Sequence, residues 1–185
     1  MIDIVAPIAP QFRANQPTEM FLNENKLSFT GDSATVKSKD GNVLFKLEAN
    51  LLSFTERRML LDSNGNVVGQ MRKKKLPSIK SKVYLGTAHD EKIVSVVKKG
   101  LLDIMHDDAD IMMGGKVIGE VKGNWRAKKF DIFINDNLVA HINRKTTVAS
   151  LALGADSYCL RVEPGVDQAF IVLVAIALDE LYHDE

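Results

Sequence analysis

The chain has 185 residues, of which 45% are hydrophobic and 26% are charged, a composition typical of one globular domain. Its 24 Lys and Arg balance its 24 Asp and Glu, which argues against nucleic-acid binding driven by overall charge. A single cysteine excludes an internal disulfide framework and a cysteine-based zinc site. The longest apolar run, 169–178, is about half of the ~20 residues that a membrane span needs. With no secretory leader visible, these features predict a soluble cytoplasmic protein.

Residues 1–20 contain three of the five prolines, Pro7, Pro10 and Pro17, among apolar residues such as Ile8 and Phe12. Proline interrupts both helices and strand ladders, so this segment is not expected to form either over its length. Two interpretations stay open: an extended arm that lies on the domain, or a disordered tail. In both cases we expect one domain over 21–185.

From residue 21 to 163 the chain alternates short apolar runs with turn signals, which predicts an all-β region. Asp40-Gly41 and Asn64-Gly65 indicate tight hairpins with type I′ turns, whose two central residues both need positive φ. In the run 130–134, Phe130, Ile132 and Ile134 share one face, as a half-buried strand requires.

A local pattern recurs at 65–72, at 115–122 and, more weakly, at 136–143. In each copy a turn leads into a strand that is expected to carry an apolar, a small and an apolar residue on one face: Val67/Gly69/Met71, Val117/Gly119/Val121 and Leu138/Ala140/Ile142. A small residue inside a strand marks a bend or the close approach of another element. The alternative interpretation is a chance likeness between ordinary hairpins.

After Pro164-Gly165 the chain changes character, and Asp167 is a good N-cap for a helix over 167–182. Such a helix is about 24 Å long and has no polar face between Ala169 and Leu178, so it must be surrounded. It is too short for lipid to surround it. Its expected core residues are Phe170, Ile171, Leu173, Val174, Ile176 and Leu178.

A closed sheet covers a helix on all sides and leaves no exposed edge. A barrel with many more than eight strands has a lumen too wide for side chains alone, and a central helix fills it. We therefore predict a closed antiparallel β-barrel of about ten to twelve strands around the C-terminal helix. Tyr158, Leu160 and Val162 are expected to face inward on the strand that precedes the helix.

Eight short segments match a known pattern in the right order. The weaker matches are 29–32, 40–45, 61–65 and 123–125, and the specific ones lie in the closing segment, at 156–158, 162–167, 169–171 and 178–180. Through these segments the chain resembles the LURP-one-related family, a branch of the tubby C-terminal-like superfamily. The resemblance implies a mainly β fold, a twelve-stranded barrel around a hydrophobic C-terminal helix. Plant members of the family are linked to defence, without an accepted biochemical activity. Because the helix is expected to fill the lumen, where barrel enzymes commonly place their sites, we expect a non-catalytic binding or scaffold module. Tubby proteins, more distant relatives, bind phosphoinositide headgroups, whereas the cysteine cluster of the related scramblases is missing here.

Basic residues gather in 70–99, where nine Lys and Arg face two acids. Juxtaposed cations can attract an anionic membrane surface. The candidate residues for binding anionic phospholipid are Arg72, Lys73, Lys74, Lys75, Lys80 and Lys82. Further clusters are Arg126, Lys128 and Lys129, and Arg144 with Lys145. The alternatives are that these cations only keep the barrel soluble, or that the chain binds a protein partner without lipid affinity. Nucleic acid is disfavoured because no aromatic residues interleave with the charges.

No motif for catalysis, cofactor or metal stands out. The acidic stretch 103–110 lacks the spacing of a calcium loop and is expected to be a solvated hairpin loop. His141 is expected to face solvent, and Cys159 to lie exposed on the outside of the barrel beside polar neighbours. An enzyme with a site in the end loops remains a remote alternative.

Overall fold

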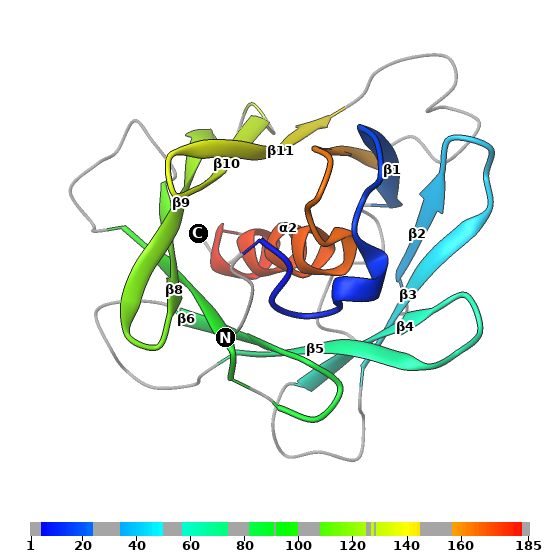
Figure 1. Ribbon diagram of the computed structural model, residues 1–185, viewed down its shortest axis with the longest axis horizontal. Coiled ribbons are helices and arrows are strands. Elements are labelled where there is room, and N and C mark those ends of the chain that lie inside the picture. The colour runs from blue at the N-terminus through cyan, green and yellow to red at the C-terminus, as the bar shows by residue number, and fades with distance from the viewer. Residues whose placement is uncertain are drawn as a thin grey trace.

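The computed structural model describes residues 5–23, 34–49, 57–73, 82–90, 92–99, 108–124, 127, 129–144 and 157–182. Within these residues, twelve strands close into one antiparallel barrel around a single α-helix (Figure 1). The elements in chain order are η1 (Pro10–Phe12), β1 (Thr18–Asn23), β2 (Ala34–Ser38), β3 (Val43–Ala49), β4 (Arg57–Asp62), β5 (Val67–Lys73), β6 (Lys82–Gly86), β7 (Val94–Lys98), β8 (Ala109–Met113), β9 (Lys116–Asn124), β10 (Lys129–Ile134), β11 (Asn137–Arg144), β12 (Ser157–Val162) and α2 (Gln168–Tyr182).

The barrel has the simplest possible order, because each strand pairs with its neighbours in the sequence. Closure comes from β1 and β12, which pair antiparallel from Thr18↔Val162 to Asn23↔Ser157. The expectation of a closed barrel of about twelve strands is therefore confirmed. β1 begins at Thr18, before residue 21, where the barrel was expected to start.

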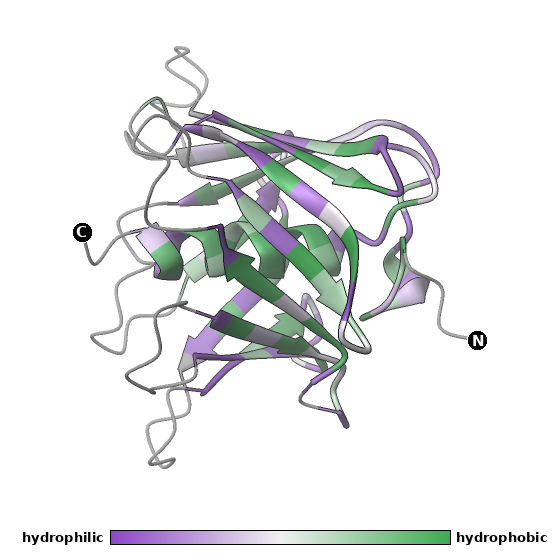
Figure 2. Cartoon of the chain, turned by 90° about the vertical axis from the view of Figure 1, so that its left-hand side faces the viewer, coloured by the Kyte–Doolittle hydropathy of each residue, from purple (hydrophilic) through white to green (hydrophobic). Residues whose placement is uncertain are grey.

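Helix α2 runs through the middle of the barrel and is buried from Ala169 to Tyr182 (Figure 2). The expected core residues of this helix are all almost completely enclosed: Phe170, Ile171, Leu173, Val174, Ile176 and Leu178. Tyr158, Leu160 and Val162 on β12 are buried against the same core. No helix in the described part of the chain combines the length and apolarity needed to cross a membrane.

The N-terminal segment closes the barrel at the end where α2 begins (Figure 1). The carboxylate of Asp167 links the two: Oδ1 accepts the N–H of Phe170 at 3.1 Å, and Oδ2 accepts those of Ile8 at 3.1 Å and Ala9 at 2.6 Å. Burial raises the pKa of Asp167, and these N–H groups oppose that shift because they favour the carboxylate. We call residues 5–17 the arm, and this segment contacts the start of α2.

The turn type expected at Asp40-Gly41 and Asn64-Gly65 is wrong. Only the glycine of each pair has positive φ, +85° in both cases, whereas a type I′ turn needs two such residues. In both hairpins the glycine N–H closes a four-residue turn, on Ser38 O and Asp62 O respectively. These are longer loops with one left-handed glycine. The pairs with positive φ at both positions are Gly114-Gly115 and Asn135-Asp136.

The recurring sequence pattern corresponds to a β-bulge just after each turn. Pairing skips one residue at Leu44, Val68, Ile118 and Val139, so two residues oppose one across the ladder. Because a one-residue shift exchanges the two faces, the expectation that the three residues of each triplet share one face is wrong at the first position. Val121 and Ile142 are buried, whereas Val117 and Leu138 are 57% and 37% exposed.

The small residue in the pattern does mark a close approach. A Cβ on Gly69 would lie 2.9 Å from side-chain atoms of both Ile8 and Leu173, where the arm and α2 pack against β5.

The expectation that Cys159 lies exposed on the outside of the barrel is wrong, because the residue is only 6% exposed. Its direct neighbour across the ladder is Phe21 on β1, a large side chain that one strand's own sequence does not reveal.

Val174→Asp tests the enclosure of α2. An unpaired carboxylate at this position, which has 0% exposure, should lower the free energy of unfolding by at least about 3 kcal/mol. Val117→Asp, at the most exposed large apolar residue described, should change it by less than about 0.5 kcal/mol. Thermal or urea unfolding measures both, and a Val174→Asp protein that melts like the wild type would show that the helix is not enclosed.

Asp167→Ala tests the junction between arm and helix. The change leaves three buried N–H groups without their acceptor, and we expect a loss of about 2–4 kcal/mol in urea unfolding. Asp167→Asn keeps one side-chain oxygen as an acceptor and should lose less. Equal stability of the alanine variant and the wild type would contradict the role given to this carboxylate.

Candidate functional site

The structure divides the candidate basic residues between two faces of the barrel wall. Arg72 and Lys73 end β5, and Lys82 begins β6, with which β5 pairs. Side chains alternate along a strand, so Arg72 lies on the outer face while Lys73 lies on the inner face with Met71. Lys74, Lys75 and Lys80 lie outside the described residues, as do Arg126, Lys128, Lys145 and the stretch 103–107.

On the outer face, two lysines converge on one aromatic ring. The Nζ of Lys82 lies 4.9 Å from the centroid of the Tyr84 ring, and that of Lys92 lies 5.5 Å from it. Cation–π contacts of this kind contribute about 0.5–1 kcal/mol at exposed sites. Arg72 is directly opposite Tyr84 across the β5–β6 ladder. Two lysines and the arginine on the next strand thus lie around one half-exposed tyrosine, so the expectation that no aromatic residue interleaves with these charges is wrong at Tyr84.

Arg57 on β4 extends this group of cations. It is the direct partner of Arg72 across the β4–β5 ladder, an arrangement that places two guanidinium side chains next to each other on the outer face. The side chain of Gln70 holds Arg57 in place: its Oε1 accepts from Arg57 Nε at 2.6 Å, and its Nε2 donates to Thr87 O at 2.7 Å. Gln70 is itself buried, so a side chain within the wall fixes the position of the Arg57 guanidinium group.

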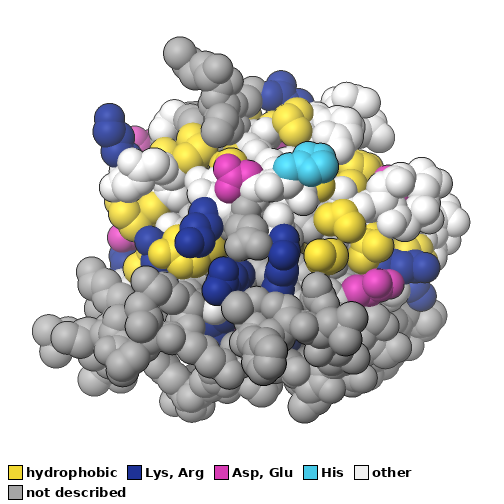
Figure 3. All heavy atoms as spheres, turned by 90° about the horizontal axis from the view of Figure 1, so that it is seen from below, with side chains coloured by type: hydrophobic (Ala, Val, Ile, Leu, Met, Phe, Trp, Pro, Cys, Tyr) yellow, Lys and Arg dark blue, Asp and Glu magenta, His cyan; other side chains and the backbone are white. Residues whose placement is uncertain are grey.

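We call Arg57, Arg72, Lys82, Tyr84 and Lys92 the wall patch. Figure 3 looks at the barrel from below, where Figure 1 places β5, and shows Lys and Arg side chains gathered near the centre of that face. An acid lies nearby: Asp90 is exposed, and its Oδ1 accepts the backbone N–H of Lys92 at 2.9 Å. The wall patch can bind an anionic group through its four cations, with an aromatic side chain at their centre.

Lys73 has an anionic partner inside the barrel mouth, at the end of α2. Its Nζ lies 3.6 Å from Glu180 Oε2 and donates to the main-chain oxygen of Glu180 at 3.2 Å. Arg58 of β4 also faces inward, with Nη2 at 3.2 Å from Glu180 Oε1. Cations at the C-terminus of a helix are favourable, because the helix dipole is negative there. This buried cluster therefore fixes the last turn of α2 to β4 and β5.

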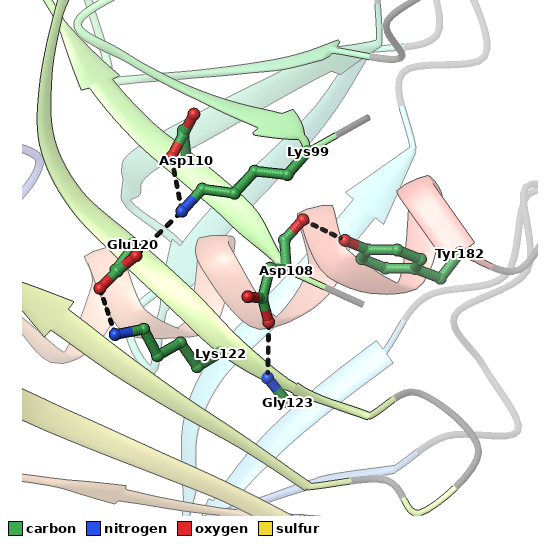
Figure 4. A network of polar contacts seen from close by, with 7 residues as sticks. All are labelled: Lys99, Asp108, Asp110, Glu120, Lys122, Gly123 and Tyr182. Carbon is green, nitrogen blue, oxygen red and sulfur yellow. Dashed lines mark hydrogen bonds and ion pairs between the residues drawn. The ribbon is translucent and has the colours of Figure 1, made fainter. Parts of the chain in front are cut away.

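A second polar network lies on the outer face of β8 and β9 (Figure 4). Lys99 Nζ pairs with Asp110 at 3.1 Å and with Glu120 at 2.9 Å, and Lys122 Nζ pairs with Glu120 at 2.6 Å. Hydrogen bonds from Lys122 and Lys99 lower the pKa of Glu120, and the bond to Glu120 raises the pKa of Lys99. Two cations face two anions here, so this network has no surplus positive charge for a ligand.

Tyr182 ties the end of α2 to the wall beside this network. Its hydroxyl donates to Asp108 O at 2.9 Å, and the carboxylate of Asp108 accepts the N–H of Gly123 at 3.2 Å (Figure 4). Lys98 lies 4.7 Å from the centroid of the Tyr182 ring. Asp108, the first described residue of the acidic stretch, thus accepts hydrogen bonds from protein groups.

His141 is about one-third exposed, and its Nδ1 lies 2.6 Å from Asp131 Oδ1 on the neighbouring strand. Among the described residues, no three His, Cys, Asp or Glu side chains come together as a metal site would require. Arg57, Tyr84, Lys92 and Gln70 were not among the predicted binding residues. A cross-strand register, which the sequence does not contain, is what brings them together.

Comparison with known proteins gives a consistent result. The family model described as LURP-one-related matches residues 18–179. Similar proteins of Arabidopsis thaliana include Protein LURP-one-related 15, 27% identical over 96% of this chain and 86% of its own length. Protein LURP-one-related 10 is 27% identical over 98% of both chains. A crystal structure of an Arabidopsis protein matches the fold with a TM-score of 0.68 at 23% identity, over 94% of this chain and 96% of that one.

The family match begins at β1 and ends in the last turn of α2, so it covers all twelve strands described and all but the last three residues of the helix. The chain belongs to the LURP-one-related family.

Proposed function

We propose that this protein is a non-catalytic binding module that docks on anionic phospholipid surfaces through the wall patch. The observation that carries the proposal is that Lys82 and Lys92 converge on the Tyr84 ring. Arg72 stands opposite Tyr84 on the next strand, and Arg57 stands opposite Arg72. A phosphate group that meets several cations on one face can accept charge-assisted hydrogen bonds from more than one of them.

The aromatic side chain supports a membrane as the source of the phosphate. Tyrosine is favoured at membrane–water interfaces, because its ring is apolar and its hydroxyl can stay hydrated. Tyr84 is half-buried in the wall with cations on either side, so ring and charges face the same direction. A flat anionic surface can contact all of these groups at once.

The central helix supports a non-catalytic role. Substrate sites of barrels commonly lie in the mouth or lumen, and here α2 fills the lumen with buried apolar side chains. The arm 5–17 closes one end of the barrel, and the Arg58–Glu180–Lys73 cluster lies at the other. The wall is therefore the face that we assign to binding.

The combined variant Arg72→Gln, Lys82→Gln and Lys92→Gln tests the proposal. Each cation near an anionic surface contributes about 1 kcal/mol, so binding should weaken on the order of a hundredfold. The measurement is co-sedimentation with phosphatidylcholine vesicles containing a phosphoinositide, and pure phosphatidylcholine vesicles give the baseline. Wild-type binding should also decrease as salt is raised, because screening weakens exposed charges.

A matched control removes three cations elsewhere. Lys37→Gln, Lys39→Gln and Lys116→Gln change the net charge equally on β2, its turn and β9, and should bind almost as the wild type. The remaining predicted residues, Lys74, Lys75 and Lys80, form a third variant, which should also bind less if they belong to the surface. Wild-type protein that ignores phosphoinositide vesicles, or equal losses in patch and control variants, would contradict the proposal and favour a protein partner.

A further inference from the structure

Lys73 is a cation next to the wall patch, and it pairs with the carboxylate of Glu180 within the fold. It follows Arg72 at the end of β5, but its ammonium group points into the barrel mouth, toward Glu180. The Glu180 side chain is 3% exposed, whereas the Lys73 side chain is 20% exposed. One end of the contact is therefore fixed inside, and the other lies at the border with solvent.

Glu180 does not depend on Lys73 alone. Arg58 pairs with it at 3.2 Å and is 5% exposed in its side chain, so this pair is the shorter and more enclosed of the two. Lys73 is 3.6 Å from the carboxylate and has a flexible four-carbon stem. If Lys73 left, the buried carboxylate would keep Arg58 as its counter-ion. Lys73 is thus the partner that can be withdrawn without leaving a buried charge uncompensated.

We propose that Lys73 is shared between two anions: Glu180 holds it in the mouth when the wall patch is empty, and an anionic membrane surface draws it outward beside Arg72 on docking. This inference rests on the proposed function. It makes Glu180 a regulator of membrane affinity, because the free energy that keeps Lys73 inside subtracts from docking. By linkage, docking also loosens the last turn of α2, which loses one of its C-terminal cations.

Glu180→Gln tests the competition, since a neutral amide holds Lys73 more weakly. Affinity for phosphatidylcholine vesicles containing a phosphoinositide should rise by up to about fivefold, the effect of one additional cation at the surface. The same change in a Lys73→Gln background should give no gain. In a Lys98→Gln background the gain should persist, because Lys98 lies over the Tyr182 ring at the same helix end and its loss leaves the contact between Lys73 and Glu180 in place.

A second measurement needs no substitution at Glu180, whose loss could leave Arg58 unpaired and unfold the protein. Amide hydrogen exchange in the last turn, 178–182, should become faster when wild-type protein binds the phosphoinositide vesicles, compared with pure phosphatidylcholine vesicles. In Lys73→Gln, which has already lost the contact, docking should leave this exchange unchanged.

The outcomes separate the two proposals. Wild-type protein that does not bind the anionic vesicles overturns the proposed function and this inference with it. Vesicle binding that depends on Arg72, Lys82 and Lys92, together with an equal effect of Glu180→Gln in the Lys73 and Lys73→Gln backgrounds, overturns the inference alone. If amide exchange in the last turn of α2 does not change when the wild-type protein binds the anionic vesicles, the inference is likewise overturned and the proposed function is not.

Discussion

Enclosure of an apolar helix is the constraint on which the rest of the structure depends. Helix α2 has no polar side chain between Ala169 and Leu178, and every one of these residues is buried. A single sheet could cover only one side of such a helix, so the wall must close around it. Polar groups appear where the enclosure ends: Asp167 anchors the arm at the start, and Glu180 binds Arg58 and Lys73 at the other end.

The same enclosure decides where a ligand can be recognised. Because the core is complete without the outward-facing residues, the outer face of each strand can carry charge at small cost to folding. Arg57 and Arg72 stand directly opposite each other on this outer face, away from the apolar core.

Features coded by the periodicity of one segment could be predicted from the sequence, and features set by neighbouring strands could not. The helix and the closed wall followed from a single apolar run, and the inward face of β12 followed from its alternation. The bulges at Ile118 and Val139 reset that alternation, which explains the misplaced Val117 and Leu138. The inward position of Lys73 was detectable, because it shares the parity of Gly69 and Met71. The anchoring of Arg57 by Gln70 was not, because it depends on how β4 pairs with β5.

Two clusters of lysines on this barrel show why charge alone does not identify a binding surface. Lys99 and Lys122 each pair with a carboxylate, and hydrogen bonds from Lys122 and Lys99 lower the pKa of Glu120. Lys82 and Lys92 lie instead against a ring, whose attraction orients an ammonium group without neutralising it. An approaching phosphate would have to break ion pairs in the first cluster, but in the second it meets a charge that is already positioned. This difference, rather than the number of lysines, favours the wall patch as the docking surface.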